Sequence, residues 1–215
     1  MTSKEHSIAN HGGSSVKAAD FPKLRAQILA SLGRSEAKSI LIVPVSETDH
    51  GTPITVGVAR AFATAGYKVM IIDAQFSSPD SHLTLKKDQY PGLAEVLINS
   101  STNELTATQY VASNLELLAA GEETNRFPDL LASTAFENLL KMFAGEQKWT
   151  FIVGDSPTTS PGVESMCQLV DTVILVDTHG KSRKRDAMAV RRSLQNLGAS
   201  VLGIVLAEDL KFEAQ

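Results

Sequence analysis

The chain has 215 residues, a hydrophobic content of 43% and a formal net charge of -4, which favours a single domain with a substantial core. The acidic balance argues against a nucleic-acid-binding protein, because such proteins present a basic surface to phosphates. Cys167 is the single cysteine, so there is no disulfide framework, and no apolar run is long enough to cross a bilayer. We expect a cytoplasmic protein that a partner recruits to the inner face of the membrane, with no direct membrane insertion.

The beginning of the chain differs in composition from the rest. Residues 1–15 are polar and end in the run GGSS, which predicts a disordered lead before a single domain over residues 16–215. His6 and His11 in this lead have no neighbours at metal-ligand spacing, so we expect both to be solvated. The first helix is predicted over residues 20–32, with Gly33 at its end.

Residues 39–82 contain the stretch that organises the domain. An apolar, β-branched run over residues 40–45 is typical of a strand buried on both faces. From Pro53 the apolar residues recur at helical spacing as far as Gly66, and a second apolar run over residues 67–72 ends in Asp73. Strand, loop, helix and strand with an acid at the tip is the opening unit of a nucleotide-binding α/β fold.

The remaining elements continue this alternation. Residues 74–89 are predicted to be a loop. Helices are predicted over residues 91–99, 103–110, 128–145, 163–169 and 183–197, and strands over residues 115–118, 149–153, 172–176 and 200–206. Strands separated by helices of this length imply a three-layer α/β fold, in which a mostly parallel sheet carries helices on both faces.

The loop before the second helix has the place of a phosphate-binding loop but lacks its chemistry. Aligned with the pattern G-x-G-K-S/T, the chain has in order Asp49, His50, Gly51, Thr52, Pro53 and Ile54. Thr52 stands in place of the lysine, Pro53 in place of the hydroxyl that binds Mg²⁺, and Asp49 would add a carboxylate near the phosphates. Losing one charge-assisted hydrogen bond costs about 1.5 to 3 kcal/mol, so these changes together weaken ATP binding by several powers of ten. We assign no cofactor, although an active site built here would use ATP and Mg²⁺.

Two acids follow buried strands. Asp73 and Asp155 each come at the carboxyl end of a predicted strand, and such ends meet at one edge of a parallel sheet. We therefore expect the two carboxylates to converge beside the loop. Either they form a catalytic metal and water site, with Mg²⁺ as the metal, or they are a pair of structural polar residues.

A basic turn, KSRKR, precedes the last predicted helix and contains Lys181, Arg183, Lys184 and Arg185. It is either a solvated helix start or a surface for an acidic partner or a nucleotide. His50 would bond a phosphate only when protonated.

Several segments, in order, resemble the cytoplasmic domain of bacterial tyrosine kinases (BY-kinases), a branch of the MinD-like P-loop ATPases that serves capsule and exopolysaccharide synthesis. The segment VMIIDAQFSSPDSH resembles that family's LLIDADLRRPSLH and keeps Asp73, Pro79 and His82. The segment PGLAEVL resembles its GLSDVL, and FIVGDSPTT resembles its VIIDTPP and keeps Asp155 and Pro157. The regions LLAAGEETNRFPDLLASTAFENLL and VDTVILVDTHGKSRKRD resemble the parts that contain PNPSELLxS and the basic turn.

The departures from the family pattern fall where its chemistry lies. Gln75 stands in place of the second acid of the strand motif, Ser77 and Ser78 in place of its arginines, and Ala207 in place of an asparagine that contacts adenine. The first helix offers Ala19, Pro22 and Arg25 where the family has the oligomerisation pattern E-x-x-R-x-x-R. The tail after Glu208 contains no tyrosine, since the chain has only Tyr67, Tyr90 and Tyr110. The resemblance therefore implies no family-type tail autophosphorylation, and it leaves homo-oligomerisation open.

Three functions remain on the sequence alone. The resemblance favours a pseudo-kinase of exopolysaccharide or capsule biosynthesis, which binds the cytoplasmic segment of a membrane polysaccharide co-polymerase or a kinase paralogue. The second is an active protein tyrosine kinase or ATPase with an altered loop. The third is a MinD- or ParA-like positioning protein.

Overall fold

The computed structural model describes residues 20–33, 38–47, 49, 51–99, 104–122, 126–160, 162–179 and 183–207. The predicted lead over residues 1–15, His6, His11, His50, Lys181 and the tail after Ala207 lie outside these residues.

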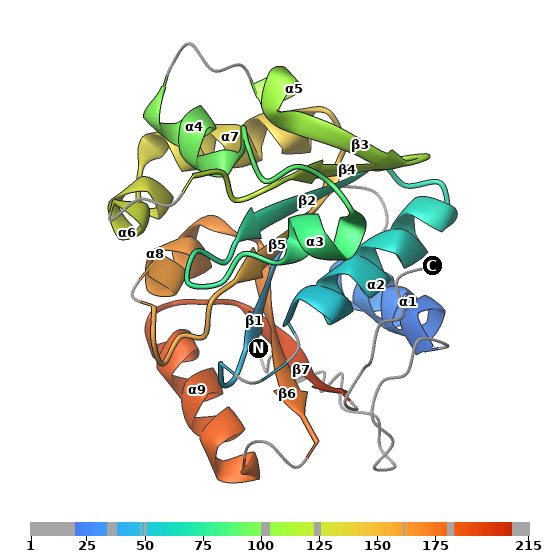
Figure 1. Cartoon of the computed structure of the whole chain (residues 1–215). Helices are drawn as coiled ribbons and strands as arrows, with labels where there is room; N and C mark the ends of the chain where they lie inside the picture. The colour runs from blue at the N-terminus through green and yellow to red at the C-terminus, as the bar shows by residue number, and fades with distance from the viewer. Residues whose placement is uncertain are drawn as a thin grey trace.

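A seven-stranded sheet with the order β3-β4-β2-β5-β1-β6-β7 forms the centre of the described part (Figure 1). Every neighbouring pair is parallel except β3 and β4, which form an antiparallel hairpin. The mostly parallel sheet predicted from the sequence is therefore confirmed. The strands are β1 (Ser39–Pro44), β2 (Val69–Ala74), β3 (Thr108–Ala112), β4 (Leu115–Leu118), β5 (Trp149–Gly154), β6 (Thr172–Thr178) and β7 (Val201–Ala207).

Helices cover both faces of this sheet, as predicted (Figure 1). One apolar layer joins alternate strand residues to α1 (Phe21–Leu32) and α2 (Gly51–Thr64), and the other joins the intervening residues to α7 (Thr134–Gly145), α8 (Gly162–Leu169) and α9 (Lys184–Asn196). Alternate residues of a strand point to opposite faces, so each central strand places apolar side chains on both faces of the sheet. The shorter helices are α3 (Ser81–Leu85), α4 (Leu93–Ile98), α5 (Glu104–Ala107) and α6 (Phe127–Leu131). No described helix is both long and apolar enough to span a membrane.

Helix α2 packs closely against α1 along one side. A Cβ atom at Gly57 would lie 2.1 Å from Cζ of Phe21, so the absent side chain is what lets the ring sit against the α2 backbone. Four residues further along both helices, Nη1 of Arg25 donates a 2.6 Å hydrogen bond to the carbonyl of Ala61. These contacts fix α1 against the helix that follows the loop.

Three predicted elements were wrong. The loop predicted over residues 74–89 contains α3, and the helix predicted over residues 103–110 stops at Ala107, after which β3 begins. Residues 108–112 form a strand and not a helix because they pair with β4 across a two-residue turn. The single helix predicted over residues 128–145 is two helices, because Ser133 takes an extended conformation and its hydroxyl accepts the amide of Phe136 to begin α7.

Candidate functional site

The carboxylates of Asp73 and Asp155 lie at the carboxyl ends of two neighbouring parallel strands, as predicted. In the register of β2 and β5, Asp73 pairs with Val153 and Ala74 with Gly154, directly before Asp155. Asp73 is 0% exposed and Asp155 is 5% exposed. The two acids therefore meet at one edge of the sheet, beside the start of α2.

Both carboxylates bind the segment that follows β2, residues 75–81, here called the strand-end loop. Asp73 accepts the backbone amides of Gln75 and Ser81, each at 3.1 Å. Asp155 accepts the amide of Phe76 at 3.2 Å and the hydroxyl of Ser77. The acids thus hold the loop against the sheet.

Burial changes the acidity of Asp73. Removal from water raises the pKa of this carboxyl from 3.8 to about 7, and the charge of Asp80 adds to the rise, although the amide donors of Gln75 and Ser81 oppose it. The group is consequently half-protonated near neutral pH, whereas a magnesium ligand must carry its charge.

The first turn of α2 contributes a hydroxyl to the same place. Oγ1 of Thr52 lies 3.2 Å from Oε1 of Gln75 and donates to the carboxylate of Asp80. In the alignment used above, the position of the metal-binding hydroxyl falls on Pro53, but in three dimensions it is Thr52 that faces the strand-end loop. A hydroxyl is therefore present in the first turn of the helix, and the loop's own carboxylate, Asp80, accepts its hydrogen bond.

Asp49 binds the protein rather than facing open space. One carboxylate oxygen accepts the amide of Ser46 at 2.8 Å and its hydroxyl at 3.0 Å, and the other accepts the amide of Thr178 at 2.8 Å. With 8% exposure, the side chain ties the loop after β1 to the end of β6. Gly51 begins α2, where its carbonyl accepts the hydroxyl of Thr55, and Ile54 is buried in the core.

The remaining predicted positions are the basic turn at the start of α9 and Ala207, which pairs with Thr178 at the end of β6. Arg183, Lys184 and Arg185 are exposed at the start of α9. Ala207 is buried at the end of β7, where its carbonyl accepts the amide of His179. Among the described residues, no group of three or more His, Cys, Asp or Glu side chains has a geometry that could hold a metal ion.

Sequence reasoning missed Ser77, Asp80 and Thr178 as members of this cluster. The bond between Thr52 and Asp80 joins positions 28 residues apart, and that between Asp49 and Thr178 joins positions 129 apart. The only available signal was the position of Thr178 at a carboxyl end of a strand, which by topology belongs to the same edge.

Comparison with protein families and known proteins gives a consistent result, although no family model matches the chain. The sequence is 28% identical over 188 residues to the putative tyrosine-protein kinase CapB of Staphylococcus aureus, covering 86% of this chain and 82% of that protein. It is 25% identical to the tyrosine-protein kinase CpsD of Streptococcus pneumoniae, covering 81% of this chain and 77% of that protein.

Solved structures show the same fold. The kinase domain of the Escherichia coli tyrosine kinase ETK superposes with a TM-score of 0.84 and 16% identity, covering 99% of this chain and 88% of that one. The chimerical protein CapA2B2 superposes with a TM-score of 0.83 and 23% identity, covering 93% of this chain and 88% of that one. A ParA family ATPase from Chlorobium tepidum superposes with a TM-score of 0.66 and 16% identity, covering 83% of this chain and 77% of that one. The chain is thus similar to the bacterial tyrosine kinases CapB, CpsD and YwqD, and it has the α/β fold that is also found in MinD and ParA ATPases.

Proposed function

We propose that this chain is a BY-kinase-like pseudo-kinase of capsule or exopolysaccharide biosynthesis, which acts by binding a protein partner. The observation that carries the proposal is the state of the strand-end loop: Asp73, Asp155 and Asp80 accept hydrogen bonds from this protein's own amides and hydroxyls. A nucleotide with Mg²⁺ would have to compete with these bonds for the acids and for the hydroxyl of Thr52.

The residues around α2 fit ATP with Mg²⁺ poorly. The segment from Ser46 to Ile54 contains no lysine or arginine, so no cation from it would face the phosphates at the start of α2. Asp49 and Asp80 add negative charge there, which opposes a polyanion. Asp73 is fully buried, with a pKa raised to about 7, so ligating Mg²⁺ at neutral pH would first cost the removal of a proton.

The partner in this proposal is the cytoplasmic segment of a membrane polysaccharide co-polymerase or a kinase paralogue. Two similarities support it: the fold of the chimerical protein CapA2B2, and 24% identity to the succinoglycan biosynthesis transport protein ExoP of Rhizobium meliloti, of which the chain covers 23%. A domain that is fused to a transport protein in one relative fits a role as a binding module in another.

Thermal unfolding with and without millimolar ATP, ADP and Mg²⁺ tests the proposal. A ligand at one hundred times its dissociation constant adds about 2.7 kcal/mol, which raises the melting temperature of a domain of this size by roughly 5 °C. We expect no shift with any nucleotide. A magnesium-dependent shift would overturn the pseudo-kinase assignment, with CpsD measured in parallel as the positive control.

One observation favours an active ATPase or kinase as the second candidate. Thr52 provides a hydroxyl beside two strand-end acids, which are groups that a P-loop enzyme uses. ATP hydrolysis that disappears in Asp155→Asn, with folding retained by circular dichroism, would establish this alternative. Nucleotide-dependent dimerisation would instead support a ParA-like positioning protein, whose fold is also similar.

A further inference from the structure

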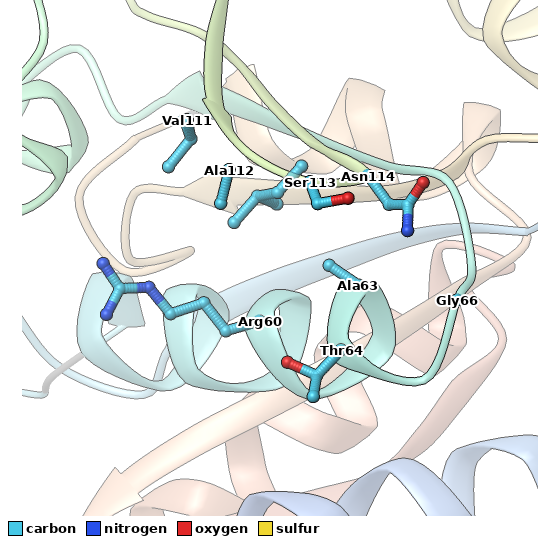
Figure 2. A pocket seen from close by; sticks show the side chains of 9 residues that line it. Arg60, Ala63, Thr64, Gly66, Val111, Ala112, Ser113 and Asn114 are labelled. Atoms are coloured by element: carbon cyan, nitrogen blue, oxygen red, sulfur yellow. The ribbon is translucent and has the colours of Figure 1, made fainter.

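A groove of about 440 Å³ lies between the second half of α2 and the β3–β4 hairpin, and Figure 2 shows the side chains that line it. It is at the opposite end of the sheet from the strand-end loop, because the hairpin turn leads into β4 beside the start of β2. Its volume falls within the range of ligand-binding sites, about 300 to 1,000 Å³. The lining residues are Arg60, Ala63, Thr64, Gly66, Val111, Ala112, Ser113, Asn114 and Leu115.

One wall of the groove is the last strand of the sheet. Within the described sheet β3 pairs only with β4, so its outer edge carries backbone donors and acceptors without a strand partner. Edge strands are commonly protected by charges, proline or bulges. Strand β3 reads TQYVA and has no charge or proline, and its pairing with β4 shifts register between Tyr110 and Ala112. Tyr110 is 68% exposed, and Ala112 is also exposed at the rim of the groove. The edge is therefore open to another extended chain.

The opposite wall supplies a positive charge. Arg60 is exposed on α2 and extends towards the hairpin (Figure 2). It forms no hydrogen bond or ion pair with another residue that the structure describes. A guanidinium can bind a carboxylate with two parallel hydrogen bonds. Ala63, Val111 and Leu115 give the space beside it an apolar surface.

We propose that this groove binds an extended peptide segment of a partner protein, which adds to the edge of β3 and directs an acidic side chain to Arg60. Side chains two residues apart in a strand point to the same face and lie roughly 6.6 Å apart. A glutamate or aspartate that reaches Arg60 is therefore accompanied, two positions away, by a small or β-branched apolar residue over Val111 and Ala63.

Peptide is the occupant that satisfies all of these features. The β3 edge can form backbone hydrogen bonds with a peptide, the apolar surface can contact alternate side chains, and Arg60 can bind a carboxylate. This is the combination found in strand addition. A free phosphate or small acid would satisfy only Arg60. The proposal is independent of nucleotide binding at the strand-end loop, so it stands if the pseudo-kinase assignment fails.

The test uses the full chain labelled with ¹⁵N and a synthetic peptide with the core Val-Thr-Glu-Thr-Val, in which each valine lies two positions from the glutamate. Nuclear magnetic resonance titration should shift the backbone amides of Tyr110, Val111 and Ala112 and the side chain of Arg60. Replacing the peptide's glutamate by glutamine should weaken binding about tenfold, the effect of losing one charge-assisted hydrogen bond. Methylating the peptide's backbone amides should also weaken binding, because it removes the donors that pair with the β3 edge. Arg60→Gln should give the same loss, and Ala112→Glu should abolish binding by repulsion.

Arg192→Gln is the matched control, since Arg192 is exposed on α9, and it should leave the affinity unchanged. The proposal is overturned if the peptide does not bind at millimolar concentration, if its shifts map elsewhere, or if Arg60→Gln binds it as tightly as the unmodified protein. It is also overturned if sedimentation shows a dimer that Ala112→Glu dissociates, because a second copy would then occupy the edge. Equal melting temperatures of the variants guard against loss of folding.

Discussion

The two halves of helix α2 differ in how completely the rest of the protein buries and binds their side chains. Residues 51–59, here the closed half, are buried apart from Pro53, pack Gly57 on Phe21 and engage Thr52 with Asp80. The open half, residues 60–64, borders the groove through Arg60, Ala63 and Thr64, and Arg60 forms no hydrogen bond or ion pair with a described residue. In P-loop proteins the ligand binds at the start of this helix. Here the start is occupied by the protein's own side chains, and the unused charge lies further along.

The largest expected effect concerns the buried acid beside the closed half. In the unfolded chain Asp73 ionises near its ordinary pKa of 3.8, and in the fold near 7. Its contribution to stability is thus complete below about pH 4 and is lost as the pH rises towards 7. Between these limits the protein should lose up to about 4 kcal/mol of unfolding free energy relative to Asp73→Asn.

Urea denaturation of both proteins at several pH values measures this difference. The asparagine variant has no carboxyl to titrate at this position, so its stability curve serves as the reference for the contribution of Asp73. Parallel stability curves for the two proteins would show that Asp73 keeps its ordinary pKa in the fold, and the acid would then be ionised and available to a metal at neutral pH.

The second effect tests the packing of the closed half. In Gly57→Ala the new Cβ atom would overlap the ring of Phe21, whose Cζ lies 2.1 Å away, and overpacking of this kind costs about 2 kcal/mol. Chemical denaturation should show the loss, and Phe21→Leu in the same chain should recover part of it. Additive losses in the double variant would mean that the ring and the glycine do not interact.

The surroundings of the two halves also differ in how well the sequence predicts them. The buried strands and the convergence of Asp73 and Asp155 were predicted, because an apolar β-branched run with an acid at its tip is a local pattern. Strand β3 was missed because residues 108–112 offer a single partly buried apolar side chain, Val111, to the core. Its strand conformation comes from pairing with β4, and no local pattern records such a partner.

The details of the site depended on distant contacts in the same way. The sequence indicated which residues a phosphate loop lacks, but the partners of Thr52 and Asp49 lie on segments far away in the chain. From the sequence alone, threonine in place of a lysine at position 52 indicates only the loss of a positive charge. That the hydroxyl then binds Asp80 is a consequence of where α3 begins, which propensity within residues 74–89 did not reveal.

A smaller effect is expected from the hydroxyl at the start of the closed half. Thr52→Val keeps the shape of the side chain and removes the hydroxyl that donates to Asp80 and lies beside Oε1 of Gln75, at a cost of about 1 kcal/mol. Hydrogen exchange of the strand-end loop amides should accelerate in this variant, while Thr52→Ser should behave as the unmodified protein. Unchanged exchange would indicate that Asp73 and Asp155 hold the loop without help from α2.

The smallest effect on the unfolding free energy is expected for Arg60 in the open half. Arg60 bonds to no described residue, so Arg60→Gln should change the unfolding free energy by less than about 0.5 kcal/mol. Lys148→Gln is the contrasting variant, because that ammonium is 13% exposed and lies 2.7 Å from Glu116 and 2.8 Å from Glu146; it should destabilise by about 1 kcal/mol or more. A measurable loss for Arg60→Gln would mean that the arginine serves the fold, whereas its absence leaves the charge free for a ligand of the groove.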